Sequence, residues 1–91
     1  MDFNFSENRQ LTTDNLTPLS DLQPGDKAIV RALPQDRLLA TRLGEMGLLS
    51  GTEITYVRKA PLGDPLEIKV RGYSLSLRLK DAAAIQVEKI S

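Results

Sequence analysis

The stretch LEIKVRGYSLSL, Leu66 to Leu77, carries the strongest structural signal in the chain. Apolar residues alternate with polar ones on both sides of Arg71-Gly72, which is the pattern of two half-buried strands joined by a tight turn. If Arg71 and Gly72 form a two-residue hairpin loop, Val70 faces Tyr73 and every apolar residue falls on one face. The other facing pairs are then Ile68 with Leu75 and Leu66 with Leu77. Because a slip of one residue would turn that face to solvent, the pattern also predicts the register.

Shorter patterns of the same kind lie on either side of this hairpin. KAIVRAL (27–33) predicts a strand that ends before Pro34, and EITYV (53–57) predicts another with Ile54 and Tyr56 on one face. IQVEKI (85–90) predicts a last strand with Ile85 and Val87 inward, after a short helical turn at KDAAA (80–84). At LSDLQPGD (19–26) we expect a single helical turn, capped by Ser20 or Asp21, and then a reversal.

The segment QDRLLATRLGEMGLLSG, residues 35–51, holds the one predicted helix. Leu39, Leu43 and Met46 recur at helical spacing, and Asp36 is of the type that caps a helix N-terminus. Gly47 suits the left-handed conformation that ends many helices.

Two residues inside this helix do not fit a simple amphipathic pattern. Gly44 should cost about 1 kcal/mol relative to alanine, so we expect the helix backbone to approach a strand closely there. Arg42 projects between Leu38 and Met46 on the apolar arc, so we expect its stem to cover the core while its guanidinium stays in water.

Taken together, the patterns predict a mainly β fold: a small SH3-like β-barrel of about five strands, with one short α-helix and a short helical turn before the last strand. Residues 1–15 are polar and lack a period, so they predict a flexible N-terminal tail ahead of a domain at 16–91. Within that tail, Phe3 and Phe5 alternate and could instead dock as a short strand on a sheet edge.

The composition argues against several classes of function. The 91 residues include no cysteine and no histidine, which removes thiolate zinc sites, thiol nucleophiles and imidazole bases. Twelve basic residues balance twelve acidic ones and aromatic residues are few, so nucleic-acid binding is not indicated. The apolar runs are too short to span a membrane and no secretory signal is evident, so we expect a cytoplasmic protein. No cofactor and no enzymatic motif is indicated, and Asp64 in APLGDP (60–65) is interpreted as a turn residue.

Several linked motifs resemble those of the ferrous iron transport protein A (FeoA) family. They are LSDLQPG (19–25), RLGEMGL (42–48), GTEI (51–54), APLGDP (60–65), VRGYSLSLR (70–78) and AAAIQV (82–87), and the resemblance covers about residues 19–88. It implies an SH3-like barrel in the bacterial cytoplasm that assists the membrane ferrous permease FeoB through its cytosolic G-protein region. The same fold also forms the C-terminal domain of iron-responsive repressors, but the helix-turn-helix region of those proteins does not precede it here.

The hypothesis is therefore a non-catalytic module that binds and modulates FeoB, held at the inner face of the membrane only through that partner. For the candidate residues the alternatives of an ordinary core side chain or a solvated surface charge stay open. Other readings are a stand-alone module for a different protein, a weak sensor of divalent transition metal ions through Glu45, Glu53, Asp64 or Glu67, and self-association through open strand edges. Arg58 or Arg71 could also act in trans on nucleotide hydrolysis. The candidate partner-binding residues are Arg42, Met46, Leu48, Leu49, Leu62, Arg71 and Tyr73.

Overall fold

The predicted hairpin is present in the computed structural model, which describes residues 16–90. Strand β4 (Leu66–Val70) pairs antiparallel with β5 (Tyr73–Leu77), and Val70 lies opposite Tyr73 as the pattern predicts. Between them Arg71 has φ 52° and Gly72 has φ 91°, and two positive φ angles in a two-residue loop define a type I′ turn. The register of the hairpin is confirmed.

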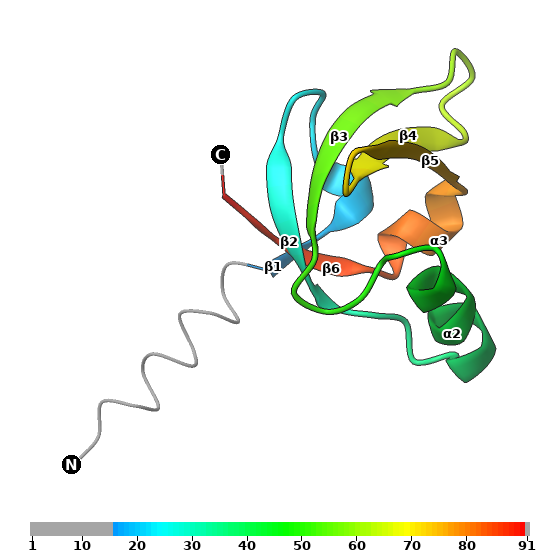
Figure 1. The fold of residues 1–91 in the computed structure, drawn as a ribbon. Coiled ribbons are helices and arrows are strands. Elements are labelled where there is room, and N and C mark those ends of the chain that lie inside the picture. The colour runs from blue at the N-terminus through cyan, green and yellow to red at the C-terminus, as the bar shows by residue number, and fades with distance from the viewer. Residues whose placement is uncertain (1–15, 91) are drawn as a thin grey trace.

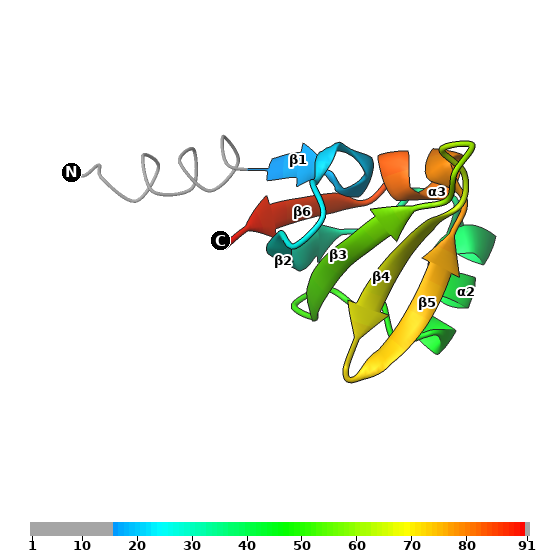
Figure 2. The ribbon, with the colours of Figure 1, turned by 90° about the horizontal axis from the view of Figure 1, so that it is seen from above.

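A single sheet of six antiparallel strands, in the order β1-β6-β2-β3-β4-β5, forms the frame of the molecule. Figure 1 shows helices α2 and α3 on one side of this strongly curved sheet, and Figure 2 shows β5 at its edge beside α2. The mainly β fold class is confirmed. The remaining elements are β1 (Leu16–Pro18), a 3-10 helix η1 (Leu19–Asp21), β2 (Lys27–Ala32), α2 (Arg37–Glu45), β3 (Glu53–Lys59), α3 (Leu79–Ala83) and β6 (Gln86–Lys89).

Strand β1 was not predicted, because three residues that include a proline are too short to show a period. It pairs with β6 and so adds a sixth strand at the edge of the sheet. The expected turn at η1 is present, but no side chain caps it: Pro18 holds the N-cap position, so the capping role given to Ser20 or Asp21 is wrong. The prediction of a flexible tail at residues 1–15, and its alternative of a docked strand at Phe3 and Phe5, lie outside the residues that the structure describes.

The core lies between the concave face of the sheet and the two helices. Period-two side chains of the strands point into it, as predicted for β3, β4 and β6, and each helix contributes a few residues. Tyr56 is also buried, and the burial raises the pKa of its phenol. The buried apolar residues are Leu19, Leu22, Ala28, Val30, Leu43, Leu48, Ile54, Tyr56, Leu66, Ile68, Val70, Leu77, Ala82, Ile85 and Val87.

Helix α2 begins and ends as the sequence predicts. The Asp36 carboxylate accepts a hydrogen bond from Leu39 N at 3.2 Å and so caps the N-terminus. At the other end Gly47 has φ 101°, Gly47 N donates to Gly44 O at 3.0 Å, and Leu48 N donates to Leu43 O at 2.9 Å. These paired bonds form a Schellman motif, in which the residue after the left-handed glycine packs back on the last helical turn.

The Schellman motif explains why one prediction about this region fails. It turns Leu48 inward, and its side chain is fully buried, so Leu48 belongs to the core and offers no surface to a partner. Leu38 departs from the expected apolar arc in the opposite sense, since it is 78% exposed and Arg42 beside it is exposed as well. An exposed Arg42 agrees with the expected wet guanidinium, and the expected packing of its stem on the core stays a prediction.

Gly44 has a different neighbour from the expected strand. A Cβ atom at this position would meet Leu49 Cδ2 at 3.2 Å, so the close approach is between the helix and the chain that follows its own C-terminus. The glycine lets the Leu49 side chain fold back against the last turn of α2.

Asp64, in the loop between β3 and β4, has a structural role. Its Oδ1 accepts a hydrogen bond from Leu79 N at 2.9 Å, at the first residue of α3. A carboxylate there satisfies a helical N–H that has no partner within the helix and also opposes the positive end of the helix. Asp64 therefore fastens the loop to α3, in addition to forming the predicted turn.

Replacing Asp64 by alanine should lower the free energy of unfolding by about 1 kcal/mol, the usual cost of losing a cap. Asp64→Asn keeps an oxygen acceptor and should cost less. Urea denaturation of both variants beside the unmodified protein measures the difference. Equal stability of Asp64→Ala and the unmodified protein would show that the bond to Leu79 contributes nothing.

Candidate functional site

Apolar and basic side chains gather where the end of α2 meets the turn between β4 and β5. Leu49 is 49% exposed and Tyr73 is 44% exposed, although both are large hydrophobic residues. Arg71, at the tip of the hairpin, is exposed as well. Tyrosine and arginine are enriched among the residues that dominate binding at protein interfaces, and an exposed leucine beside them adds apolar area that a partner can cover.

Backbone hydrogen bonds hold the loop that carries Leu49. Thr52 N donates to Leu49 O at 3.0 Å, Gly51 N donates to Val30 O at 2.6 Å, and Val30 N donates to Thr52 O at 2.8 Å. The loop is thus an extension of the ladder between β2 and β3 and is anchored on a core strand. Leu49 is therefore presented from a fixed backbone, which reduces the ordering entropy lost on binding.

Tyr73 connects the hairpin to the end of the helix. Its hydroxyl donates a hydrogen bond to the carbonyl oxygen of Met46, the C-cap residue of α2. The contact depends on Gly47, because a Cβ atom there would lie 2.7 Å from the Tyr73 hydroxyl oxygen. The ring of Tyr73 thus fixes the position of the β4–β5 turn relative to α2.

Arg42 and Met46 complete this region. They are four residues apart on α2, so their side chains neighbour each other on the helix surface. Met46 is partly buried against the core, and Arg42 is exposed. We call the group formed by Arg42, Met46, Leu49, Arg71 and Tyr73 the Leu49 surface.

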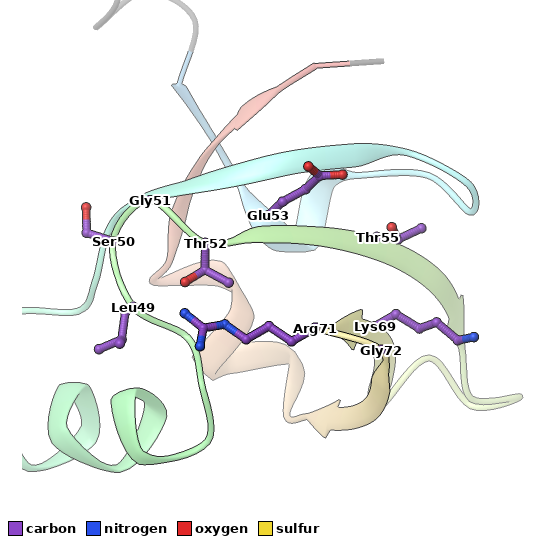
Figure 3. Close-up of a pocket in the computed structure, with 9 residues that line it drawn as sticks. All are labelled: Leu49, Ser50, Gly51, Thr52, Glu53, Thr55, Lys69, Arg71 and Gly72. Atoms are coloured by element: carbon purple, nitrogen blue, oxygen red, sulfur yellow. The ribbon is translucent and has the colours of Figure 1, made fainter.

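A shallow depression of about 570 Å³ lies next to the Leu49 surface, between the turn that precedes β3 and the β4–β5 turn. Figure 3 shows Arg71 reaching across it toward Leu49 and Thr52, whereas Lys69 and Glu53 extend away from its centre. The lining residues are Leu49, Ser50, Gly51, Thr52, Glu53, Thr55, Lys69, Arg71 and Gly72.

Five of the seven residues proposed from the sequence are thus brought together, and two are not. Leu48 is buried, as described above. Leu62 is 96% exposed, but its loop lies at the other end of β4, a strand that spans roughly 17 Å at 3.4 Å per residue. A partner that contacts Leu49 reaches Leu62 only if its footprint runs along the hairpin.

The sequence reasoning missed three residues of this region. Thr52 is the one buried polar residue within 16–90, at 7% exposed, and its place beside the depression follows from tertiary structure alone. Lys69 was taken only as the polar half of an alternating strand. Leu38, four residues before Arg42, was expected only as part of the apolar arc of the helix, and it is exposed.

The acidic residues considered as metal ligands do not converge. Within residues 16–90 no group of three or more acidic, histidine or cysteine side chains could hold a metal ion, and no helix there is long and apolar enough to cross a membrane. Asp64 is bonded to Leu79 N, and Glu67 pairs with Arg58 at 3.0 Å. The hydrogen bond from Arg58 holds the pKa of Glu67 below its ordinary value.

Comparisons with known proteins agree on one family. A family model described as the FeoA domain matches residues 17–89. A fusion protein of Fe(2+) transport protein A and the Fe(2+) transporter FeoB from Porphyromonas gingivalis is 42% identical over 73 residues, which is 80% of this chain but 9% of the relative. This chain therefore spans about a tenth of that relative's length.

Two solved structures show how far the fold agrees. The NMR structure of a FeoA-like protein from Clostridium acetobutylicum is 35% identical, with a TM-score of 0.78 over 85% of this chain and 90% of its own. A zinc complex of FeoA from Stenotrophomonas maltophilia, a prokaryotic SH3 domain protein, is 31% identical, with a TM-score of 0.66 over 77% of this chain and 87% of its own. The predicted SH3-like architecture is thus confirmed.

Gly47→Ala should destabilise the protein more than Gly51→Ala. Both glycines have positive φ, 101° and 93°, so either alanine pays about 1–2 kcal/mol of backbone strain. Only at position 47 does the new Cβ also collide with Tyr73, since nothing lies within 4 Å of the one at position 51. Thermal unfolding should therefore rank Gly47→Ala lowest, and equal melting temperatures would contradict the close contact with Tyr73.

Arg58→Gln should raise the pKa of Glu67 toward its ordinary value of 4.5. Because the pKa is lower in the folded state than in the unfolded one, the stability from this pair is present above pH 4.5 and is lost as the pH falls through the folded pKa. NMR titration of the Glu67 carboxyl carbon measures the shift. Arg31→Gln, which removes the other arginine–glutamate pair, with Glu88, is the control and should leave the Glu67 titration unchanged.

Proposed function

This chain belongs to the FeoA domain family, whose members take part in ferrous iron transport, and we propose that it is a cytoplasmic accessory module that binds and modulates the membrane ferrous permease. The observation that carries the proposal is the Leu49 surface, a rigid exposed apolar patch with arginines at its edge. The fusion relative supports the choice of partner, because in that protein the two components form one chain.

The physical case for binding rests on how the surface is held. Leu49 and Tyr73 together leave apolar area in water that burial would stabilise by about 25 cal/mol for each Å² removed from solvent. Both belong to backbone that is already ordered by the Schellman turn and the type I′ turn, so little further entropy is lost on docking. A partner that covers both side chains would therefore gain most of that energy.

A non-catalytic role is the other part of the proposal. Two of the four acids considered as ligands have structural partners, since Asp64 accepts from Leu79 N and Glu67 pairs with Arg58, and within residues 16–90 no three such side chains come together. We propose that the chain acts by contact alone and takes its place at the inner face of the membrane through its partner.

Leu49→Arg should abolish binding to the detergent-solubilised ferrous permease, because it places a charge at the centre of the apolar contact. The isolated cytosolic G-domain, run alongside, shows whether that region is enough for binding. Ile90→Arg is the matched control, because Ile90 is 47% exposed and follows β6, away from the Leu49 surface. Circular dichroism and melting temperature should stay near those of the unmodified protein for both variants.

Two outcomes would contradict the proposal. Loss of binding in Leu49→Arg and Ile90→Arg alike would mean that added positive charge, rather than this surface, is responsible. Binding of the unmodified, folded protein to neither the permease nor the G-domain would direct the search to another protein partner. Leu62→Arg, in the same assay, tells whether the contact extends along the hairpin.

A further inference from the structure

We propose that the depression beside the Leu49 surface receives one carboxylate side chain of the protein partner, with Arg71 as its main donor. The inference deepens the proposed function, because it states what chemistry the partner's docking segment must carry: an aspartate or glutamate next to an apolar residue. It rests on the proposed function for the identity of that partner, whereas the binding chemistry follows from this chain alone.

The backbone at Arg71 is the first observation. Its φ of 52° lies in the left-handed region, which costs a residue with a side chain about 1–2 kcal/mol and which glycine or asparagine adopts more readily. A type I′ turn favours asparagine at its first position, so arginine is a costly choice for the turn as such. Strain of this kind at a surface turn favours a role for the side chain.

The position of the guanidinium is the second observation. Figure 3 shows the guanidinium lying across the depression, between Leu49 on one side and the Thr52 side chain above it. Within residues 16–90 the ion pairs join Arg31 to Glu88, Arg58 to Glu67 and Lys89 to Asp26, and Arg71 takes part in none of them. A guanidinium carries five N–H donors in a planar fork, which suits a carboxylate through two parallel bonds.

Thr52 supplies the third observation. It is 7% exposed, and Figure 3 shows its hydroxyl on the same side of the depression as the Arg71 guanidinium. Its backbone is fixed by the bonds to Leu49 and Val30, so no backbone has to be ordered before its hydroxyl can donate. It offers a second donor to an oxygen held by Arg71.

The local charge decides which anion fits. Only the head group of Arg71, +1, lies over the centre of the depression, and the charges of Lys69, +1, and Glu53, −1, at its margin cancel, which leaves a formal +1. One carboxylate neutralises that charge, whereas a phosphate with −1.5 to −2 charges would leave an excess beside Glu53. Leu49 on the rim favours an apolar neighbour of the acidic residue. The geometry therefore points to a protein side chain, with a phosphate-bearing ligand as the alternative that the test must separate.

Titration with two short peptides tests the chemistry without the permease. Acetyl-Leu-Glu-amide should shift the amide signals of Thr52, Arg71 and Gly72 in ¹H–¹⁵N NMR spectra at millimolar concentration, whereas acetyl-Leu-Gln-amide should not. Inorganic phosphate is the third probe. The shifts should vanish in Arg71→Gln and persist in Arg37→Gln, a matched control at the start of α2, roughly 12 Å along the helix from its end.

Binding to the permease then tests the same inference in the full complex. Arg71→Gln should weaken binding about tenfold, as expected for a hydrogen-bonded charge pair worth about 1.5 kcal/mol, and should reduce the dependence on salt. Arg71→Lys should recover part of the loss, because it keeps the charge but not the fork. Arg37→Gln should bind as the unmodified protein does.

The outcomes separate the two proposals. If Leu49→Arg abolishes binding to the permease while Arg71→Gln leaves it unchanged, the surface is right and the carboxylate site is wrong. If the unmodified protein does not bind the permease but the Glu peptide shifts the three amides, the proposed partner is wrong and the carboxylate site stands. Equal shifts from the Glu and Gln peptides, or stronger shifts from phosphate, would overturn the carboxylate site.

Discussion

The left-handed turn at Gly47 is the constraint on which the rest of this molecule depends. A φ of 101° is open to glycine and strained for other residues, and it closes the Schellman motif at the end of α2. Because of this motif, two neighbouring leucines differ in burial: Leu48 lies in the core, and Leu49 is half exposed. The same missing Cβ lets the Tyr73 hydroxyl reach the Met46 carbonyl, so a single glycine joins the helix, the core and the hairpin.

The surface that results is exposed at some cost, and the remainder of the fold compensates for it. Leu49 and Tyr73 leave apolar area in water, and Arg71 holds an unfavourable backbone conformation. In contrast, the apolar side chains of β4 are fully buried, and their burial stabilises the hairpin that carries the turn. Because the buried side chains of β4 fix the register of the hairpin, the turn can accommodate Arg71 despite its unfavourable backbone conformation.

What the sequence could predict was set by how local each determinant is. The hairpin register and the Asp36 cap follow from period and from residue type over a few positions, and both were right. Leu38 was placed on the apolar arc and is exposed instead, because in a nine-residue helix its spacing fits a solvated face as well as the apolar arc. The bond from Leu79 N to Asp64 joins residues fifteen apart along the chain, and no local pattern reports it.

The candidate site shows the same division. The residues of the Leu49 surface were named from motif and exposure arguments, yet their assembly depends on the contact of Tyr73 with Met46, which no spacing reveals. The choice between Leu48 and Leu49 needed the hydrogen bonds of the helix end, because two adjacent leucines carry no period of their own. The role of Thr52 could not be predicted for a further reason. Threonine is common in and next to strands, so its presence there gives no sign of a binding site.

A separate chain and a fused one place different demands on such a surface. A tether that sets an effective concentration of about 1 mM lets an interface with a Kd of about 1 mM stay bound, whereas partners that are free at about 1 μM need a Kd about a thousandfold lower, which is about 4 kcal/mol more binding free energy. Without a tether, the contacts themselves have to provide this additional free energy. Covering the exposed parts of Leu49 and Tyr73 would contribute about 1 kcal/mol each, and the proposed charge-assisted bond from Arg71 would add about 1.5–3 kcal/mol. The free energy from these three contacts is of the same size as the free energy that a tether makes unnecessary. Without the proposed carboxylate contact, Leu49 and Tyr73 alone would supply too little to replace the tether.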